Sequence, residues 1–208
     1  MKINKPKINN LEDKNILDAY NEESFVNSYF KKNINEKIIL ENLYIDNCLF
    51  EKIDFNNIQL VNVDMYDVIF DSCDLSNQIF DNKFFSRIIF KNCKLVGTTF
   101  IESSMKDIEF DNCIVKYSNF SNAKIDNIKI NNSDFSESFF METKIHNINL
   151  DDVKFEKTEF VKVNLKDVDF STSNISNAIF DMYSLKDIII DRFQGLNLIG
   201  MLGVKIKD

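Results

Sequence analysis

The chain has 208 residues, a length that fits one domain or a single solenoid with caps at its ends. Four glycines, one proline and no tryptophan disfavour a loop-rich globular fold, because glycine and proline form most conventional turns. The net charge of −8 at pH 7 argues against direct binding to nucleic acid through phosphate neutralisation. No apolar run of about 18 residues and no apolar core of a signal peptide are present, so we expect a soluble, cytoplasmic protein with no membrane partner.

The first 37 residues lack the regularity of the rest of the chain. Residues 1–24 are polar, and Leu11–Tyr20 is predicted to form a short helix. Phe25 and Phe30 begin a regular apolar spacing, which polar residues then interrupt, so we interpret the segment up to residue 37 as an incomplete first coil. We expect residues 1–37 to cap an open end of the fold, where unpaired strand edges would favour association.

Residues 38–190 repeat with a period of five. Every fifth position from Leu40 to Ile190 is apolar, 31 times in succession, and the chance probability in a chain that is 44% apolar is about 10⁻¹¹. The residue two positions earlier is mostly small or β-branched. A helix repeats every 3.6 residues and a strand every 2, so a period of five requires the backbone to turn a corner after each unit.

Four such corners close a coil of about twenty residues, and stacked coils about 4.8 Å apart form an all-β solenoid, a quadrilateral β-helix. Asparagine, aspartate and serine must form the corners. Residues twenty positions apart share a column, and the two main aromatic columns are predicted to form the core rather than a cofactor site. These columns are Phe80, Phe100, Phe120, Phe140, Phe160 and Phe180, and Phe50, Phe70, Phe90 and Phe110.

The cysteines follow the same columns. Cys73, Cys93 and Cys113 share one column and Cys48 lies in another. A metal or redox ladder is one interpretation, but a straight column of buried thiols does not supply the tetrahedral ligands of zinc. We therefore expect free structural thiols and no metal or cofactor.

Two inward positions break the pattern. Gln78 and Lys83 occupy successive sites where small residues are expected. Because a buried unpaired lysine is costly, we expect a local bulge that turns Lys83 outward. Such a defect indicates either a functional site or a tolerated distortion.

The outward residues differ between the sides of the coil. The side that contains Phe50 is predicted to be net acidic, with only Lys52, Lys91 and Lys129 as basic residues, and to bind a protein partner. Its acidic residues are Glu51, Asp71, Glu109, Asp111, Asp151, Asp152, Asp169 and Asp191. The preceding side interleaves aspartates with basic residues.

The side that contains Leu40 instead exposes an apolar strip, which is a second candidate protein contact. The strip consists of Ile39, Ile79, Ile101, Phe139, Met141, Val161 and Ile179.

The pattern ends after Ile190. Residues 191–208 are predicted to form a short amphipathic helix that Gly203 stops, followed by a final strand with Val204 and Ile206. An apolar helix at the end of a rod either caps the last coil or pairs with a second copy, and we favour a homodimer. The predicted dimerisation residues are Phe193, Leu196, Leu198, Ile199, Met201 and Leu202.

Catalysis is not expected. The only histidine, His146, falls at an outward position, so one chain cannot build a histidine cluster or a Ser-His-Asp set. The glycines match no phosphate-binding loop. A convex rod filled with side chains also offers no pocket that would shift a carboxylate pKa.

The repeat units resemble the pentapeptide-repeat family. The residues that carry this resemblance are CDLSN at 73–77, SNFSN at 118–122 and SDFSE at 133–137, and the repeats extend over about three quarters of the chain. The tail FQGLNLIGMLGVKI and the repeats are similar to Qnr-type members. The unbroken register from 40 to 190 resembles the loopless Gram-positive and mycobacterial types rather than the Gram-negative ones, whose loops help to engage gyrase.

This resemblance implies a right-handed quadrilateral β-helix that dimerises through its C-terminal helix. It also implies a protein that imitates DNA, binds DNA gyrase or topoisomerase IV and protects these enzymes from quinolones. The acidic side is a weak copy of DNA in charge density, since duplex DNA carries about one charge per 1.7 Å. The alternative is a non-enzymatic interaction scaffold whose different partner binds the apolar strip around Ile101, Phe139 and Met141.

Overall fold

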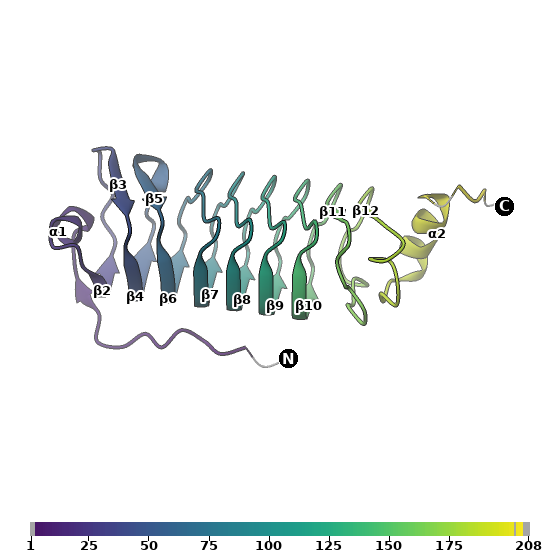
Figure 1. Cartoon of the computed structure of the whole chain (residues 1–208), viewed down its shortest axis with the longest axis horizontal. Helices are drawn as coiled ribbons and strands as arrows, with labels where there is room; N and C mark the ends of the chain where they lie inside the picture. The colour runs from purple at the N-terminus through teal and green to yellow at the C-terminus, as the bar shows by residue number, and fades with distance from the viewer. Residues whose placement is uncertain (1–2, 202, 206–208) are drawn as a thin grey trace.

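The computed structural model describes residues 3–201 and 203–205, which form an elongated stack of coils with a helix at each end (Figure 1). The N-terminal elements are β1 (Glu12–Asp13), α1 (Ile16–Asn21), β2 (Phe25–Phe30), β3 (Ile38–Glu41), β4 (Tyr44–Glu51), the 3₁₀ turn η1 (Phe55–Asn57) and β5 (Ile58–Val61). Next come β6 (Asp64–Asp71), β7 (Phe84–Lys91), β8 (Ser104–Asp111), β9 (Lys124–Asn131), β10 (Lys144–Asp151), β11 (Glu159–Phe160), β12 (Ile179–Phe180) and α2 (Arg192–Met201).

The coils stack in parallel with a register of twenty residues. The largest sheet has eight strands in the order β1-β2-β4-β6-β7-β8-β9-β10. Phe50 pairs with Phe70, Phe70 with Phe90, and Phe90 with Phe110. On the other sides the coils are joined mainly by tight turns and single bridges, such as Ile79 with Thr99. The all-β solenoid predicted from the period of five is confirmed, with about eight coils and a short C-terminal helix.

The corners are residues in the left-handed backbone region. From Asn42 to Asp187, nearly every fifth position of the chain has a positive φ, and at the non-glycine residues this angle lies between +46° and +65°. Most are asparagine or aspartate, which tolerate this conformation through short polar side chains. The long strands bend at such a residue, for example β4 at Asn47 and β6 at Asp67, so that one strand crosses two adjacent sides.

The aromatic columns fill the centre of the rod. The Phe100 and Phe120 rings have centroids 5.0 Å apart and an interplanar angle of 8°, and the Phe120 and Phe140 rings are 4.8 Å apart at 7°. The Phe50 and Phe70 rings stack in the other column at 5.1 Å and 11°. All five rings are buried. The predicted columns are therefore the core.

Where the second inward residue is polar, its side chain hydrogen-bonds to the backbone of the preceding coil. Thr98 Oγ1 donates to the Leu75 carbonyl at 3.1 Å, and Ser118 Oγ donates to the Leu95 carbonyl at 2.7 Å. Cysteine thiols do the same. Cys48, Cys73, Cys93 and Cys113 are free and buried, and their sulfurs lie 3.1, 3.3, 3.3 and 3.3 Å from the carbonyls of Phe25, Phe50, Phe70 and Phe90. The free structural thiols expected from the sequence are confirmed.

Gln78 fills a break in the backbone ladder. Its Oε1 accepts from the Leu60 N–H at 2.9 Å, and its Nε2 donates to the carbonyls of Phe55 and Ile58 at 3.3 and 2.8 Å. This long side chain therefore bonds to backbone where β5 gives way to the turn-like coils that follow. Lys83 is half-buried and its ammonium contacts the Asn62 side chain, so its charged end points outward as expected. The expected bulge is absent, because the neighbouring strands keep the register of twenty residues.

The N-terminal elements cover the first coil. Asn15 Oδ1 accepts from the Leu17 N–H at 3.0 Å and caps α1, and Ile16 and Ala19 of that helix are buried. The helix begins later than the predicted Leu11, because Glu12–Asp13 is extended and pairs with Ser28–Tyr29 of β2.

The C-terminal helix covers the last coil. Gln194 Nε2 donates to the carbonyls of Phe170 and Ser173 at 2.9 and 2.6 Å, and Leu198 is only 9% exposed. Val204 does not belong to a strand. Ile206, the other residue of the predicted final strand, lies outside the described residues.

Candidate protein-binding surface

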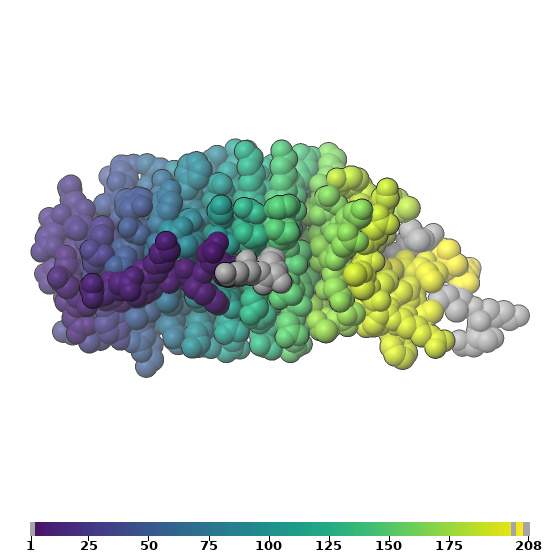
Figure 2. All heavy atoms as spheres, turned by 90° about the horizontal axis from the view of Figure 1, so that it is seen from below, coloured from purple at the N-terminus to yellow at the C-terminus, as the bar shows by residue number. Residues whose placement is uncertain are grey.

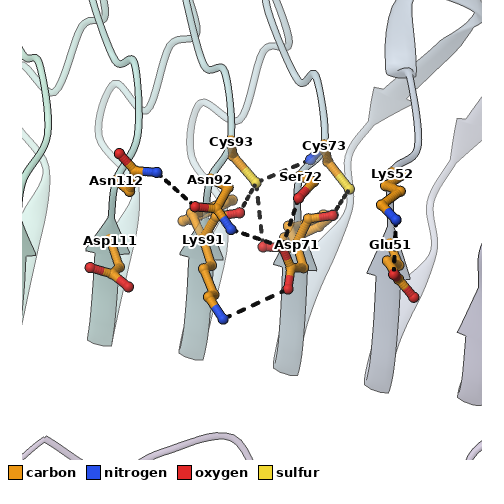
Figure 3. Close-up of polar contacts among 12 residues, drawn as sticks. Glu51, Lys52, Asp71, Ser72, Cys73, Lys91, Asn92, Cys93, Asp111 and Asn112 are labelled. Carbon is orange, nitrogen blue, oxygen red and sulfur yellow. Dashed lines mark hydrogen bonds and ion pairs between the residues drawn. The ribbon is translucent and has the colours of Figure 1, made fainter.

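The strongest candidate surface is a ladder of outward side chains on the side that contains Phe50, here called the acidic ladder. Its rungs are consecutive partners in the parallel sheet. They are Glu51, Asp71, Lys91, Asp111, Asn131 and Asp151. Figure 3 shows four of these rungs, from Glu51 to Asp111, projecting from the same side of neighbouring strands. The fold therefore holds carboxylates in register along the rod.

The lysines of this side partly neutralise its carboxylates. Lys91 Nζ lies 4.0 Å from Asp71 Oδ2, and Lys52 Nζ lies 3.6 Å from Glu51 Oε1 (Figure 3). Such solvent-exposed pairs contribute at most about 1 kcal/mol each and are screened by salt. The Glu51 carboxylate also accepts a hydrogen bond from the Tyr29 hydroxyl, which raises the pKa of Tyr29.

An N-terminal arm, residues 3–10, lies across the coils beside this ladder. Figure 2 shows it as the purple segment that runs along the rod over several coils. The Lys5 ammonium forms an ion pair with Glu109, and the Lys7 backbone N–H donates to Asp67 Oδ1 at 2.8 Å. Sequence reasoning missed this arm, because it lacks the period of five and its contacts join residues about 60 and 104 positions apart.

Asp67, which lies under the arm, accepts hydrogen bonds from both Arg87 and the arm. Arg87 Nε and Nη2 donate to its two oxygens at 2.6 and 2.7 Å. Burial alone would raise the pKa of Asp67, but the hydrogen bonds from Arg87 and from the Lys7 N–H outweigh burial and hold that pKa below its ordinary value. The same pairing raises the pKa of Arg87. The interleaved charges of this neighbouring side therefore form specific contacts.

The structure separates the predicted acidic residues into groups. Asp71 and Asp111 are half-exposed, and Asp151 and Asp152 are exposed at neighbouring positions. Glu109 does not belong to an open surface, because its carboxylate is covered by Lys5 and Lys129 and only 6% of the residue is exposed.

Two predicted acidic residues bond locally. Ser171 lowers the pKa of Asp169 through its hydroxyl and through its backbone N–H, which donates to Asp169 Oδ1 at 2.8 Å. Asp191 caps α2, because its Oδ1 accepts from the N–H groups of Phe193 and Gln194 at 2.6 and 3.0 Å. Asp169 nevertheless stays exposed, whereas Asp191 is half-buried.

The predicted apolar strip is exposed but interrupted. Ile39, Ile79, Met141 and Ile179 are 42–58% exposed, and Ile101, Phe139 and Val161 are half-buried. Along one column of bridges, Thr99 and Asn119 lie between Ile79 and Phe139, and Glu159 lies between Phe139 and Ile179. Polar residues thus interrupt this column of the strip.

The predicted dimerisation residues lie on different sides of α2. Phe193, Leu196 and Ile199 are 76%, 43% and 38% exposed and recur every three residues along one side of the helix. Leu198 instead faces the last coil of its own chain and belongs to the core. Met201 ends the helix with a side chain outside the described part of the structure, and Leu202 also lies outside it.

The residues that the structure describes contain no group of three or more His, Cys, Asp or Glu side chains arranged to hold a metal ion. His146 is exposed and its Nδ1 lies 3.0 Å from Asp126 Oδ1, at an outward position as expected. An open hollow of about 730 Å³ lies beside α2, and Ser173, Asn177, Gln194 and Leu198 line it. Among the described helices, none has the length and apolar character needed to span a bilayer.

Comparisons with known families agree with this architecture. A family model described as the pentapeptide repeat region matches residues 63–140, and a second, described as pentapeptide repeats, matches residues 148–181. The chain is a pentapeptide-repeat protein. A comparison with curated protein sequences gives no match.

Several solved structures share the repeat fold at low identity. Full-length QnrB1, described as a plasmid-mediated fluoroquinolone resistance protein, is 18% identical with a TM-score of 0.40, and the match covers 86% of this chain and 89% of that one. HetL of the cyanobacterium Nostoc sp. strain PCC 7120, described as involved in heterocyst differentiation regulation, is 15% identical with a TM-score of 0.29. That match covers 84% of this chain and 92% of HetL.

Proposed function

We propose that this protein binds a bacterial type II topoisomerase, either DNA gyrase or topoisomerase IV, at a surface that otherwise receives DNA, and that it thereby protects the enzyme from quinolones. The observation that supports this proposal best is the acidic ladder, which holds Glu51, Asp71, Asp111 and Asp151 in register along a rod, with Lys91 and Asn131 between them. The Qnr-like tail and the unbroken repeats support it from the sequence. The protein acts by binding and needs no cofactor.

The spacing of the ladder decides how it imitates DNA. Asp71, Asp111 and Asp151 are two coils apart, which is about 9.6 Å at one strand spacing per coil. Duplex DNA carries about one charge per 1.7 Å, so the ladder has far fewer charges over the same length. Shape and a few positioned carboxylates must therefore provide most of the recognition, and electrostatic steering must contribute less than it does for DNA.

The test is a supercoiling assay in which gyrase works in the presence of a quinolone. The wild-type protein should restore supercoiling. The triple variant Asp71→Asn/Asp111→Asn/Asp151→Asn should lose this protection, because it removes three ladder charges while preserving size and fold. The matched control Glu102→Gln/Glu137→Gln/Glu156→Gln removes the same charge from other sides and should protect like the wild type. Equal protection by both triple variants would exclude the ladder as the binding surface.

The second candidate function is that of an interaction scaffold for a different protein. The exposure of Ile79 and Met141, at 58% and 42%, favours it. A double variant Ile79→Asp/Met141→Asp should then lose a partner recovered from cell lysate, while the Asp71/Asp111/Asp151 variant should retain it. Recovery of topoisomerase subunits by the wild type, and their loss only with the ladder variant, would instead support the first function.

The C-terminal helix is proposed to join two copies of the chain. Its exposed residues Phe193, Leu196 and Ile199 lie at the end of the rod, so a dimer formed there would roughly double the length of the acidic surface.

A further inference from the structure

The N-terminal arm is seated on a defined row of polar side chains at the corner between two sides of the rod. This row is here called the corner ladder and consists of Asn47, Asp67, Arg87 and Asp107. The Asn4 backbone N–H and Nδ2 donate to the two carboxylate oxygens of Asp107 at 3.3 and 2.9 Å. Figure 2 shows the arm continuing along the rod over successive coils.

At its other end the arm contacts the corner ladder through its backbone. The Asn9 N–H donates to Asn47 Oδ1 at 2.9 Å, and Asn47 Nδ2 donates to the Asn9 carbonyl at 2.8 Å. The Lys7 N–H bonds to Asp67 between these two points. Backbone groups make most of these contacts, so much of the recognition does not depend on the arm's own sequence.

The spacing of the corner ladder suits an extended polypeptide in general. Asn4, Lys7 and Asn9 contact Asp107, Asp67 and Asn47, which lie three coils apart. Three coil steps amount to about 14 Å, and five residues of extended chain span about 16 Å. About three residues of any extended segment therefore match two coils, and its polar groups meet the rungs repeatedly.

The corner ladder is built to hold its shape. Asp67 and Asp107 are 7% and 2% exposed, and besides the arm each is fixed from within the rod. Arg87 holds Asp67 through both carboxylate oxygens, and Asn127 Nδ2 donates to Asp107 Oδ1 at 3.0 Å. The carboxylates are therefore oriented toward a donor segment independently of the arm.

The arm itself is attached through polar contacts. None of its residues belongs to the buried core, whereas α1 just after it is anchored by Ile16 and Ala19. The side chain of Lys5 remains 58% exposed although its ammonium contacts Glu109. Hydrogen bonds and ion pairs of this kind are modest and, for the charged ones, sensitive to salt, so the arm is a segment that a competitor can replace.

We propose that the corner ladder is a binding site for an extended, lysine-containing polypeptide segment, that the chain's own arm is its resident occupant, and that a segment of the same chemistry on a partner protein binds by displacing the arm. The arm covers Glu109 at the edge of the acidic side, so its displacement also enlarges the accessible acidic surface.

The experiment uses full-length protein and, as the probe, a fluorescein-labelled peptide with the sequence INKPKINN, which corresponds to residues 3–10. The variant Asn4→Ala/Lys5→Glu/Lys7→Pro releases the arm, because it removes the Asn4 amide, reverses the charge next to Glu109 and deletes the Lys7 N–H. NMR spectra of the arm amides report release through sharp, random-coil signals. Peptide binding is followed by fluorescence anisotropy at low salt.

We expect the released variant to bind the peptide at least 10-fold more tightly than the wild type, whose own arm competes. Adding Asp67→Asn/Asp107→Asn to the released variant should weaken binding at least 10-fold. The matched control Glu137→Gln/Glu156→Gln, in the same background, changes the net charge equally beyond the arm's reach and should leave binding within about 2-fold.

Four results would overturn the proposal. They are an arm that stays docked in the released variant, a released variant that does not bind the peptide, peptide binding that is equally tight in the wild type, and peptide binding that Asp67→Asn/Asp107→Asn does not weaken. The measurement contains no topoisomerase, so its failure and a failure of quinolone protection are separate results.

Discussion

Corner residues carry most of the backbone strain of this fold. An ordinary L-residue in the left-handed region costs roughly 1–2 kcal/mol, and asparagine and aspartate reduce that cost by bonding locally. Several corners nevertheless hold longer side chains, among them Tyr117 and Lys157 with φ values of +59° and +56°. Each of these positions is an opportunity to stabilise the rod.

Replacing Lys157 by asparagine should stabilise the protein by about 0.5–1 kcal/mol, because asparagine adopts the left-handed backbone conformation at a lower free-energy cost than lysine does. Lys157 is exposed, and its corner bond, from its N–H to the Ser176 carbonyl at 3.0 Å, belongs to the backbone and survives the change. Urea unfolding of the two proteins measures the difference. Lys157→Val is the opposite control, since a β-branched residue is a steric outlier at positive φ and should lower stability. A destabilised asparagine variant would contradict this account.

Because the cysteine thiols are buried, we expect the free energy of unfolding to fall at alkaline pH. Burial raises the pKa of Cys48 to about 12 from a reference of 9.0. The pKa of the Cys48 thiol is therefore higher in the folded than in the unfolded protein. The stability that this thiol contributes is complete below about pH 9. It declines as the pH rises toward 12, because in that range only the unfolded protein's thiol ionises. The decline amounts to about 1.4 kcal/mol per pH unit.

Comparison with Cys48→Ala isolates this effect from the titration of tyrosines and lysines. The stability difference between wild type and variant, from urea unfolding, should shrink by about 2 kcal/mol between pH 8 and pH 10.5. A difference that stays constant over this range would show that the Cys48 thiol ionises equally in both states.

The sequence predicted single residues well wherever the period applied. Phe100, Cys93 and His146 lie where the repeat placed them, because a period of five fixes whether a side chain points inward or outward. The cover over Glu109 was not predicted in full, because Lys129 lies one coil away in the repeat but Lys5 is 104 residues away and outside it. Local periodicity carries no information about such a contact.

At the scale of elements, the sequence did not distinguish the sides built from strands from the sides built from turns. All four sides have the same five-residue unit, yet β6 is a continuous strand across two sides while the segment around Leu75 consists of turns. Gln78 marks where the geometry changes, and its irregularity in the sequence is explained by the three backbone groups that it bonds.

Replacing Gln78 by threonine should destabilise the protein although threonine restores the small residue that the pattern favours. Threonine is too short to reach the Leu60 N–H and the Ile58 carbonyl together, and each buried unsatisfied group costs about 1–3 kcal/mol. We expect a loss of roughly 2 kcal/mol, measured as a shift of the urea midpoint at constant slope.

The control for Gln78→Thr is Thr98→Ser in the same column. It keeps the hydroxyl that donates to the Leu75 carbonyl and should change stability much less. If both variants had the same midpoint, Gln78 would not be bridging a break in the ladder.

For the whole molecule, the two ends decide how rods associate. The N-terminal end is covered by α1, while α2 leaves Phe193, Leu196 and Ile199 exposed on one side and buries Leu198 on the other. The sequence predicted an apolar helix. It could not tell which residues pack on the chain's own last coil and which are left for a second copy, because the helix is apolar on both sides. Leu198 completes the core of its own chain, and the exposed row is the surface that remains for a second copy.

If two copies pair through this row, Phe193→Asp/Leu196→Asp should give monomers with an intact solenoid. The reason is that two carboxylates on each copy would have to be buried against each other in the dimer, and an unpaired buried charge is far more costly than the apolar contact it replaces. Sedimentation velocity at about 50 µM distinguishes the two states, and circular dichroism verifies the fold. Leu198→Asp should instead lower the melting temperature, because it places a charge against the last coil. A wild type that sediments as a monomer, or a double variant that sediments unchanged, would exclude pairing through α2 and limit the acidic surface to a single rod.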